Sequence, residues 1–476
     1  MEKRFLKYIT IAAFILVIGG FAVMNLVITP PQALASERRA PAAFPKLTTE
    51  SFGDASFMNG FENWAQDRFP LRETLRTIRA GTIYGAFQQT DKDGLYLGAS
   101  GAGKFQKIDE TAWTQTITKI NLLAKGLEDG TYADGGLKLY AAVIPDKSVY
   151  AGRYLPGYDP DTAKRLISEN LDQRIQAIDI GEALAGKDFY RTDLHWSQPE
   201  TLGVMDALNT AMTGNGADSG ADSGAAADRA DRADNGDGSL CLVPARQREP
   251  SPLSALSAAA PLSAPLSVDI AGTFKGVYAG QVALPMAPDS LVYVSTSNID
   301  SASASYLDPK TATMQPGKVY YPEALTDGGD PYDFFLNGPQ AVIVLETRTT
   351  SASEPTAGEP AAGDSSASGS TSGAPSTSAP SSSEPTTDTS STDEPTTGTS
   401  SSTNAPSGKT LYLFRDSFGS SLAPLFLGAY DRVVLIDMRY IDSRILSNYV
   451  TFEPGSDVLF LYSSQIMNNP TSLLIR

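Results

Sequence analysis

Apolar residues fall in three patterns along the chain, and each pattern predicts a different kind of element. One is a continuous run from about Ile9 to Ile28, which has the roughly 20 residues that a helix needs to cross a bilayer. A second is a set of short apolar runs with the length of buried strands: 137–147, 341–346, 410–414, 432–436 and 457–462. The third is a set of stretches with helical character: 111–127, 161–178, 199–212 and 420–427. Because short strands alternate with helices, we predict an α/β fold with a mostly parallel sheet and helices on both faces.

The amino-terminal apolar run predicts a membrane anchor. It is preceded by three basic residues: Lys3, Arg4 and Lys7. Since no basic residue directly follows the run, the amino terminus is expected inside and the body outside the cytoplasm. We therefore assign 1–30 to an uncleaved anchor and 31–47 to a tether. A cleaved signal peptide is the alternative, because Ala33-Leu34-Ala35 forms an A-x-A site.

Two tracts of low complexity interrupt the body, at 213–266 and 349–408. The first begins with a stretch nearly free of large apolar residues and continues as a mixture of Ala, Ser, Pro and Leu, and the second has no aromatic and no basic residue. We predict that both are disordered, and the second is a candidate for glycosylation on its hydroxyls. The ordered remainder is expected to be one domain made of three segments: 48–212, 267–348 and 409–476. The last of these segments is too short for a confident core of its own, and long insertions add little loop-closure entropy.

A stem precedes the sheet domain. Four aromatic residues have helical spacing there: Phe57, Phe61, Trp64 and Phe69. We predict an amphipathic helix that packs on the domain and stops or restarts at Pro70; the alternative is that the aromatic rings grip a ligand. The stretch 94–105, with its glycine turns, predicts a hairpin.

Two later helices carry expected capping residues. Asp161 is expected near the cap of the 161–178 helix. The sequence from Ser197 to Glu200, with Pro199 in the first turn, has the pattern of a capping box for the 199–212 helix.

Charge and cysteine content exclude several functions. The formal net charge of −17 and the pI near 4.6 argue against nucleic-acid binding. The single cysteine, Cys241, excludes an intrachain disulfide and a zinc cluster of cysteine and histidine, and we expect no cofactor.

The candidate chemistry lies in two distant stretches. His195, the one histidine of the chain, stands two residues after Asp193 in the loop 190–197. Ser417 lies in a turn, 416–419, directly after the predicted strand 410–414. A carboxylate that orients an imidazole, and an imidazole that takes the proton of a serine, are the parts of an activated nucleophile.

Other interpretations of these residues stay open. His195 could be an ordinary loop residue bonded to Asp193, and Ser417 could simply cap the following helix. Ser420 and Ser421 are nearby but would lie inside that helix. A metal site at Asp193 and His195 would have no further histidine or cysteine to complete it.

The motifs also carry a family resemblance. TDLHW, RDSFGSSLAPLF and IDMRYID resemble the DHHW family of bacterial envelope proteins, which is similar to the SGNH-hydrolase-like domains of alginate O-acetylation proteins. FENWAQDRFPLRE, YLG, VIPDK, FKGVYAG and YDFFLNG add to the resemblance. It implies a flavodoxin-like, SGNH-hydrolase-like fold, a membrane anchor and a triad of Ser417, His195 and Asp193. Leu194 replaces the first histidine of the name motif and leaves the triad histidine in place.

The resemblance implies further site residues. SGNH enzymes use glycine and asparagine as additional oxyanion donors, for which Gly419 and Asn337 are the candidates, although Asn-Gly pairs also occur in turns for conformational reasons. Trp196 is a candidate substrate contact. Asp416 and Arg439 are expected to brace the turn and the strand ends.

The function implied is that of an extracytoplasmic O-acetyltransferase whose acceptor is a cell-envelope or secreted polysaccharide. A multipass membrane O-acyltransferase would supply the acyl group. An esterase with the same triad, and a wall-binding or assembly protein with a vestigial triad, are the alternatives. We expect no nucleic acid and no metal as partners.

Overall fold

The computed structural model describes these residues: 2–27, 29, 34, 40–98, 100–132, 136–151, 158–213, 266–347 and 408–476. Residues 214–265 and 349–407 of the two low-complexity tracts, Cys241 among them, and residues 31–33 and 35–39 of the tether lie outside them, so the predictions made for those segments stay predictions.

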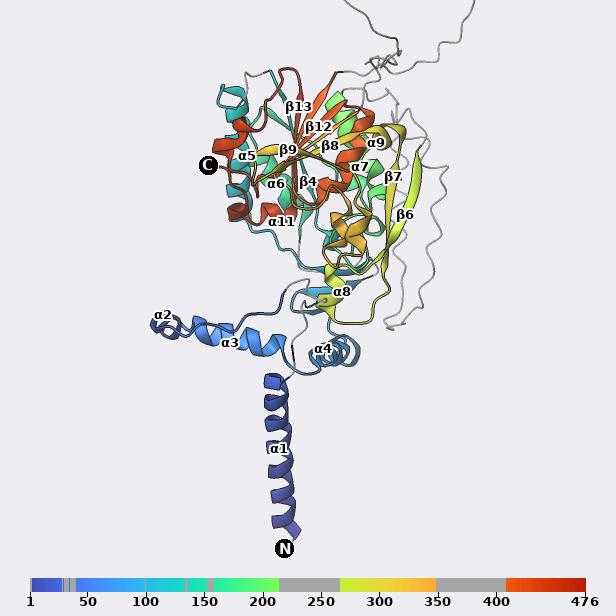
Figure 1. The fold of residues 1–476 in the computed structure, drawn as a ribbon. Helices are drawn as coiled ribbons and strands as arrows, with labels where there is room; N and C mark the ends of the chain where they lie inside the picture. Colours follow the sequence, from blue (N-terminus) through green and yellow to red (C-terminus); the bar gives the residue numbers. More distant parts are fainter. Residues whose placement is uncertain are drawn as a thin grey trace, which may run out of the picture. The chain divides into compact units, whose positions relative to one another are not determined.

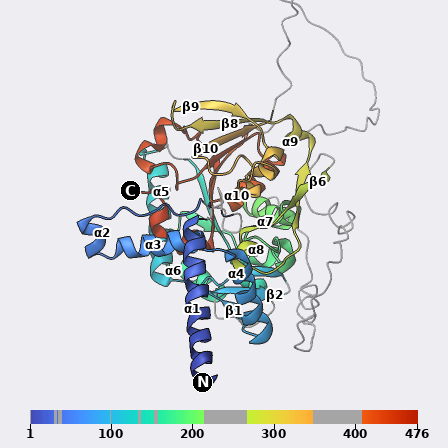
Figure 2. The same cartoon turned by 60° about the horizontal axis from the view of Figure 1, so that its bottom comes forward.

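An eight-stranded sheet forms the centre of the domain. Its strands, in spatial order, are β5 (Ile175–Ala177), β4 (Lys138–Ile144), β13 (Asp457–Ser463), β11 (Thr410–Arg415), β12 (Arg432–Ile436), β10 (Val342–Glu346), β8 (Ser303–Asp308) and β9 (Thr313–Gly317). The first five pair in parallel, and the last three join antiparallel, side by side at one edge (Figure 2). The predicted mostly parallel α/β fold is therefore confirmed.

The alternation of side chains along β11 explains how helices cover both faces of the sheet. Tyr412 and Phe414 point into one apolar cluster, and Leu411 and Leu413 point into another, all without exposed surface. Helices α5 (Glu110–Glu128) and α6 (Pro160–Asn170) contribute to the first cluster, and α7 (Leu202–Thr213) contributes to the second, so that α5 and α7 lie on opposite sides of the strands in Figure 1. Burying a side chain of this size stabilises the fold by about 1.5–3 kcal/mol.

Two helix predictions need correction. The helix expected over 161–178 ends at Asn170, and the chain then enters β5 beside β4. The amide of Asn121 binds the main chain at Asn170 and Asp172, which turns the chain toward the sheet edge. The N-cap of this helix is Asp159, whose carboxylate accepts from the next turn, and not Asp161.

The third predicted helix begins differently from the capping-box prediction. A 3₁₀ turn, Gln198–Thr201, precedes α7, and the side chain of Ser197 makes no capping hydrogen bond. Pro199 does lie in the first turn, where its missing N–H costs nothing.

Two smaller sheets flank the central one. One contains β1 (Asp91–Lys92), β2 (Leu95–Gly98) and β3 (Gly101–Lys104), of which β2 and β3 form the predicted hairpin. The other pairs β6 (Ser267–Phe274) with β7 (Asp289–Ser295). The shorter helices of the body are α8 (Val277–Val282), α9 (Ser297–Ser301), α10 (Phe418–Leu422), which a 3₁₀ turn extends over Ala423–Gly428, and α11 (Ser464–Met467).

The amino-terminal segment contains α1 (Glu2–Val27), α2 (Thr49–Gly53), α3 (Ser56–Asp67) and α4 (Arg72–Gly81). Within the described residues, α1 is the one helix long and apolar enough to cross a membrane. The stem prediction is correct about the helix and its break near Pro70. Its rings at Phe57, Phe61 and Trp64 pack around Phe44 of the tether, with centroids 5.1–6.3 Å apart.

Candidate active site

Ser417 stands where β11 ends and α10 begins, at the edge where the parallel strands present their carboxyl ends. Its hydroxyl does not cap α10. The carboxylate of Asp416 caps it instead, since Oδ1 accepts from the N–H of Phe418 at 3.0 Å and Oδ2 accepts from the N–H of Ser463 at 2.8 Å. Asp416 thus braces the turn and leaves the half-buried Ser417 hydroxyl available to another partner.

That partner is His195, brought from 222 residues earlier in the chain. Its Nε2 lies 2.9 Å from Ser417 Oγ, and its Nδ1 lies 2.7 Å from Asp193 Oδ1. A carboxylate only accepts, so Nδ1 carries the proton and Nε2 is left to accept the serine proton. The Tyr332 ring stacks on the imidazole at 3.8 Å with an interplanar angle of 7°, and fixes its plane.

The Asp193 carboxylate is itself held by the start of α8. Its Oδ1 accepts from the backbone N–H of His195 at 3.2 Å, and its Oδ2 accepts from the N–H of Val277 at 3.0 Å. A Cβ at Gly276 would lie 2.3 Å from Asp193 Cβ, so only glycine permits this approach. These contacts orient the carboxylate that orients the imidazole.

A buried lysine holds the loop from another side. Lys147 is 4% exposed, and its ammonium donates to the carbonyl oxygens of Ala102 at 2.8 Å, Tyr190 at 2.5 Å and Asp193 at 3.2 Å. Burial lowers the pKa of Lys147 to about 8, while the nearby carboxylates of Asp289, Asp193 and Asp146 oppose that shift. The ammonium therefore ties both ends of the Asp193 loop to the β2–β3 hairpin.

Asp289 completes the support of this loop. Its carboxylate accepts from the N–H of Arg191 at 2.9 Å and from the N–H and hydroxyl of Thr192 at 2.7 and 2.5 Å. Sequence reasoning missed Lys147, Asp289 and Tyr332 as site residues. The motifs VIPDK and YDFFLNG contained two of them, but nothing in the sequence indicated their contacts.

Trp196 occupies a different position from the one predicted. The ring has no exposed surface, and its Nε1 donates to Ser421 Oγ at 2.9 Å and to the carbonyl oxygen of Phe418 at 3.2 Å. The prediction of a substrate contact is therefore wrong, because a fully enclosed ring cannot reach a substrate. Trp196 instead fastens the histidine loop to α10, and the same contact encloses Ser421.

Of the two predicted oxyanion donors, Gly419 has its N–H engaged in this structure, and Asn337 lies in an exposed turn. The N–H of Gly419 donates to the carbonyl oxygen of Asp416 at 3.1 Å. A Cβ at Gly419 would lie 2.6 Å from Arg415 Cβ, so this glycine allows α10 to pack on a buried arginine. Asn337 is exposed in a left-handed turn with φ of 54°, and its carbonyl oxygen accepts from Gln340 at 3.2 Å. Their roles as oxyanion donors stay predictions.

Arg439 lies at the end of β12, where it forms a two-point ion pair with Asp437 at 2.8 and 2.6 Å. Asp437 Oδ1 also accepts from the backbone N–H of Arg439 at 3.1 Å, and Arg415 Nη1 lies 3.5 Å from Asp437 Oδ2. Arg439 thus braces a strand end. Among the described residues, no group of three or more histidine, cysteine, aspartate or glutamate side chains could hold a metal ion.

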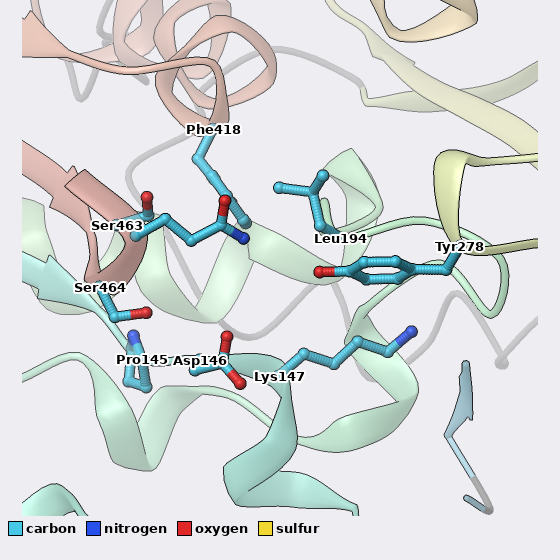
Figure 3. A pocket seen from close by; sticks show the side chains of 9 residues that line it. Pro145, Asp146, Lys147, Leu194, Tyr278, Phe418, Ser463 and Ser464 are labelled. Atoms are coloured by element: carbon cyan, nitrogen blue, oxygen red, sulfur yellow. The ribbon is translucent and has the colours of Figure 1, made fainter. Parts of the chain in front are cut away.

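A small cavity lies beside the two candidate stretches, with Leu194 and Phe418 in its lining (Figure 3). Its volume is about 10 Å³, room for about one water molecule. The lining residues are Pro145, Asp146, Lys147, Leu194, Tyr278, Phe418, Ser463, Ser464 and Gln465. Figure 3 shows the hydroxyl of Tyr278 pointing into the cavity near Leu194.

The polar groups of this cavity belong to neighbouring strand ends. The registers that pair β4 with β13, and β13 with β11, bring Asp146, Gln465 and Ser417 to the same edge of the sheet. Burial raises the pKa of Asp146 to about 6, and burial also raises the pKa of Tyr278 well above its usual value. The cavity thus offers a neutral phenol and a carboxyl beside Phe418, the residue that follows Ser417.

The chain matches no protein-family model, and no curated protein matches its sequence. Among solved structures it is similar to a DHHW family protein from Eubacterium siraeum, with 15% identity and a TM-score of 0.46 over 80% of this chain and 94% of that chain. It is similar to PatB1 from Bacillus cereus, with 13% identity and a TM-score of 0.44 over 78% of this chain and 96% of that one. The O-acetyltransferase domain of Pseudomonas putida AlgJ gives 11% identity and a TM-score of 0.34 over 79% and 92%. These neighbours include a member of the family that the motifs resemble, but likeness at this level transfers no residue roles.

Proposed function

We propose that this chain is a membrane-anchored, extracytoplasmic O-acetyltransferase that acetylates a cell-envelope or secreted polysaccharide. One observation supports the chemistry above all others: Ser417 Oγ lies 2.9 Å from His195 Nε2, and His195 Nδ1 lies 2.7 Å from Asp193. The sugar acceptor and the extracytoplasmic side rest on the motif resemblance and on the charges around α1.

The first half-reaction forms an acetyl-serine. Ser417 Oγ bonds to the carbonyl carbon of the donor while its proton passes to His195 Nε2, and the Asp193 carboxylate stabilises the imidazolium. The bond between the carbonyl carbon and the donor's leaving oxygen then breaks, and the leaving oxygen takes the proton from Nε2. Such general-base help typically contributes about 10²–10⁴ in rate.

The second half-reaction passes the acetyl group to the acceptor. A sugar hydroxyl gives its proton to His195 Nε2 and attacks the acetyl-serine, and Ser417 recovers the proton as its ester bond breaks. A multipass membrane O-acyltransferase is the proposed source of acetyl groups. With water in place of the sugar, the same steps describe an esterase.

The test uses the full chain in detergent with 4-nitrophenyl acetate as donor. We expect the mass of the intact protein to increase by one acetyl group, and the Ser417→Ala variant to form no adduct. Ser420→Ala is the matched control, because Ser420 lies in the same turn but is 2% exposed. Unchanged turnover in the Ser417→Ala variant would refute the assignment.

Addition of an oligosaccharide then separates transfer from hydrolysis. Acetylated sugar, detected by mass, supports the transferase. Free acetate as the sole product would identify the chain as an esterase.

A further inference from the structure

Exposed apolar side chains concentrate in one part of the body. Between residues 44 and 87, ten large apolar side chains are exposed, whereas the described residues after 87 have five. Phe52 and Phe87, for example, are 75% and 69% exposed. A soluble surface rarely gathers apolar side chains in this way unless another apolar phase covers them.

Helix α4 has two faces, and the described part of the chain covers one of them. One face of α4 and of the turn that continues it packs on the body, where Ala80 and Tyr84 join a buried cluster and Arg76 donates to the Gly280 carbonyl oxygen at 2.9 Å.

The opposite face of α4 carries Leu75 and Ile78, and Leu71 is the residue that directly precedes the helix. Leu71, Leu75 and Ile78 follow one another at i, i+4, i+7 spacing and are 62%, 42% and 59% exposed. The helix therefore has a second apolar face in addition to the one that it needs for folding.

The anchor helix indicates what lies against this face. The candidate span covers Lys7–Asn25. At its outer end, the Asn25 amide donates to the Ala65 carbonyl oxygen at 2.9 Å, and Phe21 stacks on Phe69 with centroids 5.3 Å apart. Phe69 is two residues before Leu71, so the exposed stripe begins at the level where the span would leave the hydrocarbon.

We propose that α4, with the aromatic cluster of α3, lies in the outer lipid–water interface of the membrane that α1 crosses, with the Leu71–Leu75–Ile78 stripe against the acyl chains. A helix with leucines and isoleucine on one face and arginines on the other is typical of an interfacial helix. Trp64, with Arg68 over its ring at 5.0 Å, has the amphipathic character of side chains at the headgroup level.

The charge of the stretch 44–87 is compatible with binding to a lipid surface. The stretch 44–87 holds five basic and five acidic residues and is neutral, whereas the whole chain carries −17. The segment would therefore meet anionic headgroups without repulsion, and its binding depends on apolar contact more than on salt.

The test places a fluorescent bimane on single cysteines in the full chain, with Cys241→Ser as background. The chain is reconstituted in phosphatidylcholine vesicles of two kinds, which contain lipids with a doxyl quencher either near the headgroup or near the end of the acyl chain. Leu75→Cys and Ile78→Cys report on the stripe, Ile15→Cys reports on α1, and Ile445→Cys, at a body position 43% exposed, is the matched control.

We expect doxyl lipids to quench the labels at 15, 75 and 78, and aqueous iodide to quench the label at 445. If doxyl lipid quenches the label at 15 while iodide quenches the labels at 75 and 78 as it does the label at 445, the interfacial docking is refuted. A face that binds a protein partner would give this result. If 15 also responds to iodide, the anchor and the docking that rests on it both fail. None of these readouts depends on catalysis, so they stand apart from the proposed activity.

Discussion

In an Asp193→Asn variant, the side-chain amide can take either of two orientations, and the contacts of Asp193 predict which one is favoured. The two carboxylate oxygens each accept, one from His195 Nδ1 and the other from the Val277 N–H. An amide has one oxygen and one NH₂ group, so it satisfies only one of these donors. With its oxygen on Val277, its NH₂ faces Nδ1 and forces the tautomer with a proton on Nε2, which cannot accept the proton of Ser417.

The size of the expected loss of kcat/KM follows from the free-energy cost of the orientation in which the amide oxygen accepts from His195. With its oxygen on His195, the amide leaves the part-buried Val277 N–H unsatisfied, at about 1–3 kcal/mol; with its oxygen on Val277, it leaves the backbone N–H of His195, which bonds to the carboxylate at 3.2 Å, unsatisfied at about 1 kcal/mol. The productive orientation is then disfavoured by up to about 2 kcal/mol, or about 30-fold. A neutral amide also stabilises the imidazolium less than a carboxylate does, by about tenfold in rate. We expect kcat/KM of Asp193→Asn to fall about 10- to 300-fold.

A second substitution tests this explanation. Val277 is the first residue of α8, a position that tolerates proline, and Val277→Pro removes the competing N–H. We expect the double variant Asp193→Asn/Val277→Pro to regain about tenfold over Asp193→Asn alone in the hydrolysis of 4-nitrophenyl acetate. Val277→Pro alone is the control for its effect on folding and activity. A double variant no more active than Asp193→Asn, with Val277→Pro itself active, would contradict the orientation argument.

Two further predictions concern the lysine clamp and the buried carboxyl. Lys147→Met removes the donor to three carbonyl oxygens. The histidine loop is then displaced, and we expect kcat/KM to fall about 10²-fold. The control is Lys92→Met, which removes another buried lysine, 8% exposed, and should leave kcat/KM within about twofold of the parent. Asp146→Asn keeps the acceptor for the Ser148 N–H. Burial raises the pKa of Asp146 to about 6, so as the pH rises from about 4 to 6 the folded chain keeps the proton of Asp146 after the unfolded chain has lost it. Above this pH range the carboxyl therefore destabilises the fold by about 1–3 kcal/mol. The variant should therefore gain stability over the parent at pH 7 but not at pH 4 in urea unfolding; an equal difference at both pH values would contradict this.

The central strands could be predicted because each is a continuous apolar run buried on both faces. β9 could not, because all its residues are exposed at the sheet edge and its sequence, TMQPG, has no strand pattern. β5 could not be predicted either, because its three residues are too few to interrupt the helical pattern expected over 161–178. Local sequence determines the elements with strong periodicity, whereas edge strands depend on the neighbour that they pair with.

The residues of the candidate site also fall into those that the sequence could predict and those that it could not. The lone His195, the adjacent Asp193 and the strand-end Ser417 could be proposed from residue type and position. Lys147 and Asp289 could not, because their roles consist of contacts across 46 and 97–98 residues with main-chain atoms, which leave no pattern in the sequence. Trp196 was misassigned because an aromatic ring beside a histidine gives no sign of whether it faces solvent or core.

The middle of the sheet is made from segments late in the sequence. β11 and β13 stand between β4 and β12, so the β5–β4 pair joins the other strands only through Asp457–Ser463. During synthesis, the imidazole of His195 is therefore present long before the Ser417 hydroxyl that it meets, 222 residues later in the chain. A chain that ends before Asp457–Ser463 would lack the strand that joins the two parts of the sheet, so the acyl chemistry proposed above requires the whole sheet.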